Sequence, residues 1–310
     1  MTPQRPLVEP ASAGNTVRAR QAQPRLTDPG LSQSERKPAL HAWGMLGRMP
    51  GSSDPSDPYA AFAPSYDWLA NDEVMSGESF WNRFGDSLST LPSGAHVLDC
   101  ACGTGYNVLA LTQHGFTVSG SDASQAMLTE ARRRLPEHVN LRHCAWSELP
   151  GAFAEPFDAV VCTGNSLMHA GDEYSMVAAL TGISGVLKPG GMLLLDSRNY
   201  EKLRSERPLL QPRPPISRSG QAAVAVYTWH WPDHWDADHR VEITVISTDG
   251  HQTTLGRTNI TYRPFSFEDL TERLARVGFE ILSHTFSTET YLYEVTARLS
   301  SSTTDTPNDD

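Results

Sequence analysis

The sequence has no apolar run long enough to cross a membrane and no apolar stretch of the kind that forms an export signal. None of its segments reaches the roughly 18 consecutive apolar residues that a transmembrane helix needs. The N-terminal stretch, MTPQRPLVEP, is polar and contains three prolines, unlike the apolar centre of a secretory signal. We therefore expect a cytoplasmic protein that does not associate with a membrane.

Cysteine and positive charge are also scarce. The four cysteines are Cys100, Cys102, Cys144 and Cys162, and three of them lie in or beside apolar runs, which favours buried thiols over a metal site. There are 25 Lys and Arg against 36 Asp and Glu, so the formal net charge is -11. Such an acidic chain is a poor binder of nucleic-acid phosphates. We expect a small-molecule substrate, no nucleic-acid partner and no bound metal.

Hydrophobic residues make up only 39% of the chain, and the deficit lies at its two ends. Residues 1–57 are rich in Pro, Gly, Ser, Gln and Arg and show neither helical nor strand periodicity. Residues 300–310 have the same character. Segments of this composition bury too little apolar surface to offset their ordering entropy, so we expect both ends to be disordered. Residues 58–299 remain as one folded domain.

Within that domain, apolar strand-like runs alternate with helical patterns. The expected strands are 96–100, 117–121, 140–143, 157–163 and 192–196, and the expected helices are 107–114, 124–135 and 176–187. Ser124 is placed to cap the second of these helices, and the breaker Lys-Pro-Gly-Gly at 188–191 ends the third. This alternation predicts βαβ units, and therefore an α/β fold with a Rossmann-like, doubly wound, mostly parallel sheet.

The pattern changes between residues 201 and 264. Residues 201–219 are polar and proline-rich, and three strand-like runs follow at 222–231, 240–248 and 253–262, joined by turn signals. We expect an antiparallel β meander inserted into the α/β domain as a lid. A helix at 267–277 and two closing strands at 280–286 and 291–299 complete the domain.

A glycine-rich turn, Asp-Cys-Ala-Cys-Gly-Thr-Gly, follows the first expected strand. It begins at Asp99, and Gly103 and Gly105 allow the backbone to turn sharply and to approach a ligand. In an open α/β sheet this turn lies at the ligand-binding crevice. Asp122 ends the next strand, where a carboxylate accepts both hydroxyls of an adenosine ribose. A role at the start of the following helix, beside Ser124, is the alternative.

The same turn distinguishes two classes of nucleotide site. A dinucleotide fingerprint has Gly or Ala at the position of Val108, which disfavours an NAD-dependent reductase. The turn instead resembles motif I, D-x-x-x-G-x-G, of class I S-adenosylmethionine (SAM) methyltransferases. The segments FDAVV at 157–161 and LKPGG at 187–191 resemble the later motifs of that family. The resemblance extends over about residues 60–296 and implies the class I methyltransferase fold.

The resemblance also implies SAM as the methyl donor and a set of residues around it. Asp99 would organise the loop around the methionine amine, Asp122 would bind the ribose, and Trp146 would border the adenine. Aromatic residues of a helical N-terminal segment, Tyr66 among them, would face the sulfonium. The full set implied for the cofactor is Tyr66, Asp99, Ala101, Gly103, Gly105, Asp122, Ala145 and Trp146. For Trp146 and Tyr66, ordinary packing is the alternative.

Two further segments narrow the resemblance. T-G-N-S-L-M-H at 163–169 resembles the G-N-S-x-x-H segment of glycine and glycine/sarcosine N-methyltransferases, and D-S-R-N-Y at 196–200 resembles their D-x-R-N-Y segment. In that family, the residues matching Asn165 and Arg198 hold the carboxylate of the acceptor, and His169 lies beside the methionine part of SAM. His169 is a candidate proton relay, and Tyr200 completes the implied site. Arg198 suits a carboxylate because its planar fork pairs with both oxygens. An ordinary ion pair for Arg198 and a core or capping role for His169 are the alternatives.

The sequence departs from that family at two places. Arg263 stands where the family has tyrosine in its Tyr-Tyr-Pro or Met-Tyr-Pro segment, and no arginine near Met75 matches the one that the family uses beside the SAM carboxylate. We therefore expect methyl transfer to the amine of a small amino acid or amino-acid-like acceptor. A small-molecule O- or C-methyltransferase of secondary metabolism and a non-catalytic SAM-binding module are the alternatives. A homo-oligomer is compatible with the sequence.

Overall fold

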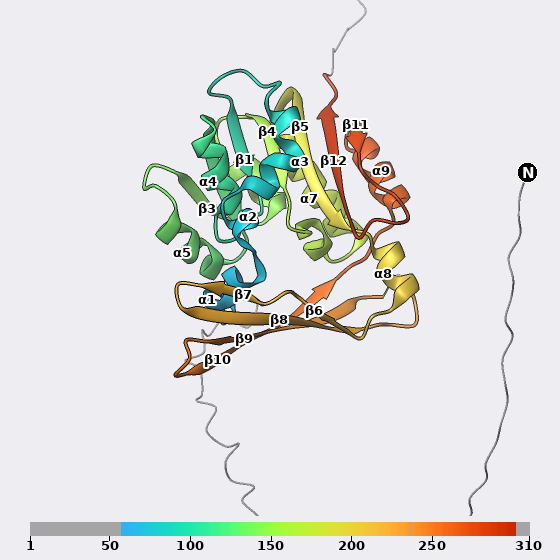
Figure 1. Ribbon diagram of the computed structural model, residues 1–310. Helices are drawn as coiled ribbons and strands as arrows, with labels where there is room; N and C mark the ends of the chain where they lie inside the picture. Colours follow the sequence, from blue (N-terminus) through green and yellow to red (C-terminus); the bar gives the residue numbers. More distant parts are fainter. Residues whose placement is uncertain (1–56, 236, 302–310) are drawn as a thin grey trace, which may run out of the picture. The chain divides into compact units, whose positions relative to one another are not determined.

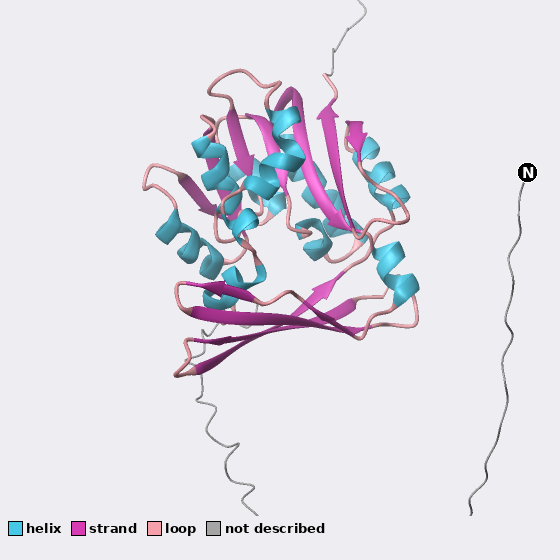
Figure 2. Cartoon of the chain, viewed as in Figure 1, coloured by secondary structure: helices cyan, strands magenta, loops and turns pink. Residues whose placement is uncertain are grey.

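The computed structural model describes residues 57–301 apart from residue 236. The expected disordered ends therefore lie almost wholly outside the described residues. The described part contains a seven-stranded sheet flanked by helices and a separate five-stranded sheet (Figures 1 and 2). None of its helices combines the length and the apolar character needed to span a bilayer.

The seven-stranded sheet has the order β11-β12-β5-β4-β1-β2-β3. Its parallel strands are β1 (His96–Asp99), β2 (Thr117–Asp122), β3 (Asn140–His143), β4 (Phe157–Cys162) and β5 (Leu187–Arg198), and β11 (Phe279–His284) and β12 (Leu292–Leu299) form an antiparallel edge. The strand order reverses between β1 and β4, so a ligand crevice is expected at their carboxyl ends. The predicted parallel sheet is confirmed.

Helices cover both faces of this sheet, because neighbouring strand residues point in opposite directions. Val97 and Leu194 pack into one core with α3 (Glu78–Leu88), α4 (Tyr106–Gln113) and α5 (Gln125–Arg134). Leu98 and Leu193 pack into the other core with α7 (Glu173–Gly185) and α9 (Phe267–Arg276). Short turns of helix complete this second side: η2 (Trp146–Glu148), α6 (Leu149–Ala152) and η3 (Ser166–Ala170). The doubly wound arrangement is therefore confirmed.

The strand β5 begins earlier than the sequence predicted. The expected strand began at residue 192, but β5 begins at Leu187 and runs through the breaker residues. Phe157 pairs with Leu187, and Ala159 pairs with Met192, so residues 188–191 bulge out opposite a single residue of β4. Gly190 has a φ of 78°, which the bulge requires. Residues 188–191 therefore separate the preceding helix from the rest of the strand, as predicted, but they do not interrupt the pairing of β5 with β4.

The polar, proline-rich segment 201–219, for which the sequence analysis named no helix or strand, has regular structure. It contains α8 (Tyr200–Glu206), β6 (Leu210–Pro212) and β7 (Ile216–Arg218). The side chain of Asn199 caps α8 by accepting from the Lys202 amide at 3.1 Å, and Leu203 is buried. Prolines lack the amide that a sheet needs, so the two strands remain short and lie along the edge.

The inserted meander is confirmed as a second sheet, here called the insertion sheet. It consists of β8 (Gln221–His230), β9 (His239–Thr248) and β10 (Thr253–Tyr262), with β6 and β7 both paired to β8. Along β8, Ala225, Tyr227 and Trp229 are buried against the main domain, and the residues between them are more exposed. The insertion sheet lies across one end of the main sheet (Figure 1).

The expected helical N-terminal segment is present as α1 (Ala63–Tyr66), η1 (Asp67–Leu69) and α2 (Asp72–Met75), followed by α3. Asp67 accepts a hydrogen bond from the Thr104 hydroxyl at 3.0 Å and pairs with Arg134. Arg218 of β7 donates to the Asp72 carboxylate at 2.8 Å. The segment is therefore fixed to both the glycine-rich turn and the insertion sheet.

Candidate active site

The two glycines of the turn between β1 and α4 have different roles. Both have positive φ, 52° at Gly103 and 91° at Gly105. A Cβ on Gly105 would lie 2.9 Å from a methyl of Leu135, just after α5, and the φ of 91° is one that residues with a side chain rarely adopt, so both features favour glycine here. A Cβ on Gly103 would meet only the Met127 methyl at 3.5 Å. Gly103 therefore leaves the backbone open at the crevice.

Asp99 has a buried carboxylate with one unpaired oxygen. Its side chain is 1% exposed, and Oδ1 accepts from the Ala101 amide at 3.2 Å. Oδ2 has no hydrogen-bond partner among the described residues. Burial raises the pKa of Asp99 to about 7. An unpaired buried acceptor is costly, so the arrangement suits a ligand that brings a cation or a donor to Oδ2.

Asp122 connects the glycine-rich turn to the next helix. Its Oδ2 accepts from the Gly103 amide and its Oδ1 from the Ser124 amide, both at 2.8 Å. Burial raises the pKa of this carboxyl as well. Ser124 itself caps α5, as predicted, by accepting from the Met127 amide at 3.1 Å. Asp122 thus supports the loop and the start of the helix while it stands at the crevice.

Trp146 is anchored against the same turn. Its indole Nε1 donates to the Cys100 carbonyl at 2.9 Å, and the side chain is half-buried. Ala145, just before it, is exposed, and its amide donates to Glu148. The indole is therefore held in one orientation beside the ends of β1 and β3.

A cluster of tyrosines surrounds His169. The Tyr59 hydroxyl lies 3.1 Å from His169 Nε2, and the Tyr262 ring centroid lies 5.1 Å from that of His169. Tyr66 packs edge-on against Tyr59 with ring centroids 5.9 Å apart. Burial lowers the pKa of His169 to about 4, so the imidazole is neutral. The predicted residues Tyr66 and His169 are brought together.

Tyr59 is a site residue that the sequence analysis missed. It lies next to the predicted disorder boundary, where proline and serine dominate the composition. Asp57, inside that predicted boundary, accepts from the Ser124 hydroxyl at 2.7 Å. The available signal was the aromatic density that begins at Tyr59 and continues through Phe62 to Trp68.

Asn165 joins the ends of β4 and β5. Its backbone has a φ of 63°, and its amide donates to Asp196 Oδ1 at 2.8 Å. Its side-chain oxygen accepts from the Arg198 amide at 2.9 Å, and Nδ2 points to the Tyr200 hydroxyl at 3.4 Å. The second oxygen of Asp196 pairs with Arg83 at 2.6 Å. The side-chain nitrogen of Asn165 carries a second hydrogen that it can donate to a ligand.

Arg198 lies between aromatic rings and has no acidic partner within the described part of the chain. Its guanidinium carbon is 4.8 Å from the Tyr227 ring centroid and 5.6 Å from that of Trp229. Burial by itself lowers the pKa of Arg198, but Tyr262, Tyr227 and Tyr200 raise it by more, so it ends above its usual value. The ordinary ion pair that the sequence left open is therefore not formed with any described carboxylate. A charged, half-buried guanidinium without a carboxylate partner suits an anionic ligand.

The departures from the resembled family are visible in the structure. The Arg263 side chain reaches Asp238 at 3.3 Å on the surface, and its amide donates to the Met168 carbonyl at 2.9 Å. Arg263 therefore fixes the turn after β10 to η3 without entering the tyrosine cluster. Residues 57–301, with 236 left out, hold no group of three or more His, Cys, Asp or Glu side chains arranged for a metal ion.

Comparison with known proteins agrees with this geometry. A family model described as "Methyltransferase domain" matches residues 97–191. Glycine N-methyltransferase of Oryctolagus cuniculus is 31% identical over 207 residues, which cover 59% of this chain and 68% of that enzyme. Glycine/sarcosine N-methyltransferase of Aphanothece halophytica is 37% identical over 113 residues, covering 36% of this chain and 43% of that enzyme. The chain thus spans less than half the length of some of these relatives.

Solved structures resemble the fold over most of the chain. A SAM-dependent methyltransferase from Clostridium acetobutylicum has a TM-score of 0.61 at 21% identity, covering 77% of this chain and 97% of that one. The sugar N-methyltransferase KedS8 from Streptoalloteichus has a TM-score of 0.58 at 21% identity, covering 80% and 98%. At this identity the likeness extends to the fold alone.

Proposed function

We propose that this chain, which belongs to the SAM-dependent methyltransferases related to glycine N-methyltransferase, transfers a methyl group to the amine nitrogen of an amino acid or an amino-acid-like acceptor. The observation that carries the proposal is Arg198. It is a charged guanidinium that lies over the rings of Tyr227 and Trp229, with no carboxylate partner among the described residues. An acceptor carboxylate supplies the missing counter-ion.

The residues of the crevice fit the methyl donor. The free Oδ2 of Asp99 suits the ammonium group of the methionine part, and Gly103 leaves room for close approach. Asp122 stands where a carboxylate suits ribose hydroxyls, and Trp146 offers a fixed aromatic face to the adenine. SAM supplies a methyl group already activated by the sulfonium. The residues of the chain therefore act by positioning and by excluding water.

On the acceptor side, Arg198 would fix the carboxylate, and the Asn165 amide nitrogen and Tyr200 hydroxyl lie beside it. An amine reacts only through its free lone pair, so it must arrive unprotonated. His169 is oriented by its hydrogen bond with Tyr59, and burial lowers its pKa and keeps it neutral, so it adds no positive charge near the sulfonium. The clustered tyrosine faces favour the sulfonium cation through cation–π attraction.

Transfer of label from isotopically labelled SAM to matched acceptors tests this proposal. We expect label in glycine, sarcosine or a larger amino acid, and much less in the corresponding amide or decarboxylated amine. Glycolate, which keeps the carboxylate but replaces the amine by a hydroxyl, should remain unlabelled. Labelling of hydroxyl or carbon nucleophiles in preference to every amine would favour the O- or C-methyltransferase alternative.

SAM affinity should depend on pH through Asp99. Its pKa of about 7 means that the unliganded carboxyl binds a proton at lower pH, whereas the ammonium of SAM favours the carboxylate. Binding must then expel that proton, so affinity should fall below about pH 7 by up to about tenfold per pH unit. The sign for stability is opposite: the unliganded protein gains stability as pH falls through about 7, because the folded carboxyl holds its proton more tightly than the unfolded chain.

Calorimetric titration with SAM between about pH 5.5 and about pH 8 measures this dependence. Asp99→Asn should bind SAM more weakly and lose most of the slope. Any slope that remains belongs to Asp122, whose pKa is also raised by burial. An affinity of the Asn variant that follows the wild-type pH curve would contradict the role given to Asp99.

A further inference from the structure

Asp196 is a buried carboxylate that connects helix α3 to the acceptor side of the site. It lies in the second half of β5 and is 2% exposed. Its Oδ1 accepts from the backbone amide of Asn165 at 2.8 Å, and its Oδ2 pairs with the Arg83 guanidinium at 2.6 Å. Arg83 belongs to α3, 113 residues away in the sequence. A charge on α3 is therefore linked to Asn165 through a single carboxylate.

Asn165 has a backbone conformation that needs support. Its φ of 63° lies in the left-handed region, which residues with a side chain adopt uncommonly. Its side-chain oxygen accepts from the Arg198 amide at 2.9 Å, and its Nδ2 lies 3.4 Å from the Tyr200 hydroxyl. The bond from its own amide to Asp196 therefore fixes the residue whose side chain contacts both Arg198 and Tyr200.

The Asp196 carboxylate depends on Arg83 for its counter-ion. Within the described part of the chain, the pair with Arg83 is the one salt bridge that Asp196 makes. A buried carboxylate that loses its counter-ion takes up a proton or turns toward water. Either change weakens the bond to the Asn165 amide, because an ionised acceptor makes the stronger hydrogen bond. The same pairing also keeps Asp196 from becoming the partner of Arg198, two residues further along β5.

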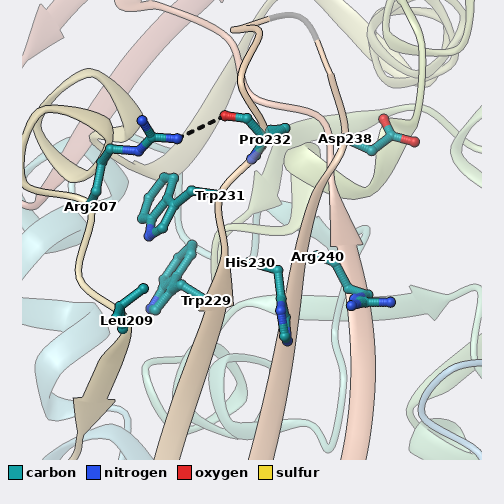
Figure 3. Close-up of a pocket in the computed structure, with 8 residues that line it drawn as sticks. All are labelled: Arg207, Leu209, Trp229, His230, Trp231, Pro232, Asp238 and Arg240. Carbon is teal, nitrogen blue, oxygen red and sulfur yellow. Dashed lines mark hydrogen bonds between the residues drawn. The ribbon is translucent and has the colours of Figure 1, made fainter.

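Asp238, just before β9, is likewise contacted by another arginine. Trp229, which the Arg198 guanidinium contacts, stacks on Trp231 with ring centroids 5.2 Å apart. Asp238 lines the surface depression beside these indoles, but Figure 3 shows its carboxylate pointing away from them. Arg263 contacts this carboxylate at 3.3 Å. Arg198 therefore gains no carboxylate partner from this part of the insertion sheet.

We propose that Arg83 is a positioning residue for the methyl acceptor. By pairing with Asp196, it holds Asn165 in its left-handed conformation and leaves Arg198 free for the carboxylate of the acceptor. Its effect passes through Asp196 and needs no contact between Arg83 and the acceptor. The inference rests on the proposed function, because it takes Asn165 and Arg198 as the acceptor side of the site.

Steady-state kinetics with the amine that the wild type methylates provide the first test. Arg83→Gln should raise the KM of that amine by about tenfold or more, with much smaller changes in kcat and in SAM affinity. Arg83→Lys should restore a KM near that of wild type, because Arg83 reaches Asp196 through one nitrogen and an ammonium can replace a single bond. Arg273→Gln is the matched control: Arg273 is similarly buried and pairs α9 with Glu173 of α7, so its loss should lower stability and leave KM unchanged.

Asp196→Asn tests whether Arg83 acts through this carboxylate. The variant keeps an oxygen for the Asn165 amide and removes the charge that Arg83 balances. In this background, Arg83→Gln should change KM little, because both changes remove the same contact. The double variant leaves no unpaired carboxylate at residue 196, so the test remains decisive if Arg83→Gln alone fails to fold. A tenfold effect of Arg83→Gln that persists in the Asp196→Asn background would overturn the inference.

Hydrogen–deuterium exchange of the unliganded proteins gives a readout that needs no methyl transfer. The Asn165 amide should exchange faster in Arg83→Gln than in wild type, Arg83→Lys or Arg273→Gln, because its acceptor is no longer held in place. The inference is overturned if either the exchange of this amide or the KM of the acceptor in Arg83→Gln matches the wild type. Failure of the proposed function would appear in the wild type instead, as methyl transfer to hydroxyl or carbon nucleophiles in preference to every amine.

Discussion

Arg198→Lys is expected to lower kcat/KM for a carboxylate-bearing amine by about 100-fold or more, which corresponds to roughly 3 kcal/mol of lost positioning and pairing. The change keeps the positive charge. It removes the planar fork that pairs with both carboxylate oxygens, and it removes the guanidinium contacts with the Tyr227 and Trp229 rings. The hydrogen bond from the backbone amide of residue 198 to the side-chain oxygen of Asn165 is kept, so the ends of β4 and β5 should remain joined.

Steady-state kinetics and SAM titration check this result together. SAM affinity should change little, because Arg198 is on the acceptor side of the crevice. Arg257→Lys provides a matched control: its arginine is also on the insertion sheet, but it is exposed and lies 3.6 Å from Glu242. A similar loss of kcat/KM in both variants, or a loss that appears only in SAM affinity, would show that Arg198 does not bind the acceptor.

Asp122→Ala is expected to weaken SAM binding by about tenfold to about 100-fold, or about 1.5–3 kcal/mol, through lost charge-assisted hydrogen bonds. Two effects contribute. The carboxylate is lost from the ribose position, and the amides of Gly103 and Ser124 lose the acceptor that fixes the loop. Asp122→Asn should lie between wild type and the Ala variant, because an amide oxygen still accepts one of these bonds.

Asp158→Ala is the control for the loss of a carboxylate that accepts hydrogen bonds from the backbone. Asp158 also accepts from a backbone amide, that of His96 at 2.8 Å, and pairs with Lys188, but it stands near the start of β4, at the other end of the sheet. That variant should lose stability and keep its SAM affinity when both are measured in one titration series. NAD should not bind the wild-type protein detectably. SAM binding by Asp122→Ala equal to that of wild type would show that the ribose lies elsewhere.

The part of the fold that could be predicted is the part set by local sequence. The strands β1 and β4 and the second half of β5 are apolar runs with both faces buried, and a turn or a capped helix follows each. Ser124 and the glycine-rich turn begin helices through bonds within a few residues. Such signals depend on neighbours in the sequence, so they could be read without a structure.

The parts that were missed depend on contacts between distant segments. The helix α8 exists because Asn199 caps it and because Tyr200 and Leu203 are buried beneath the insertion sheet. Polar composition and prolines hide that burial in the sequence. Tyr59 enters the site through His169, 110 residues away. Sequence patterns report local periodicity, and they do not report which remote surface will cover a segment.

The candidate site also contains features that could be predicted from the sequence and features that could not. The positions of Asp99, Asp122 and Arg198 follow from their places at strand ends, because the carboxyl ends of parallel strands meet at one edge of a sheet. Whether Arg198 has an acidic partner did not follow. Asp196, two residues away, was an obvious candidate, but it pairs with Arg83 from α3 instead. Only the tertiary structure shows which of the two arginines takes that carboxylate.

A thermodynamic cycle between Arg198 and the acceptor carboxylate tests the central claim most directly. The kcat/KM of wild type and of Arg198→Lys is measured with the amino acid that accepts the methyl group from SAM, and again with the amide of that amino acid. If Arg198 binds the carboxylate, replacing the carboxylate by the amide should cost the wild type about 100-fold and the variant much less, because both changes remove one contact. Equal losses in the two enzymes would show that Arg198 does not contact the carboxylate, and would contradict the account.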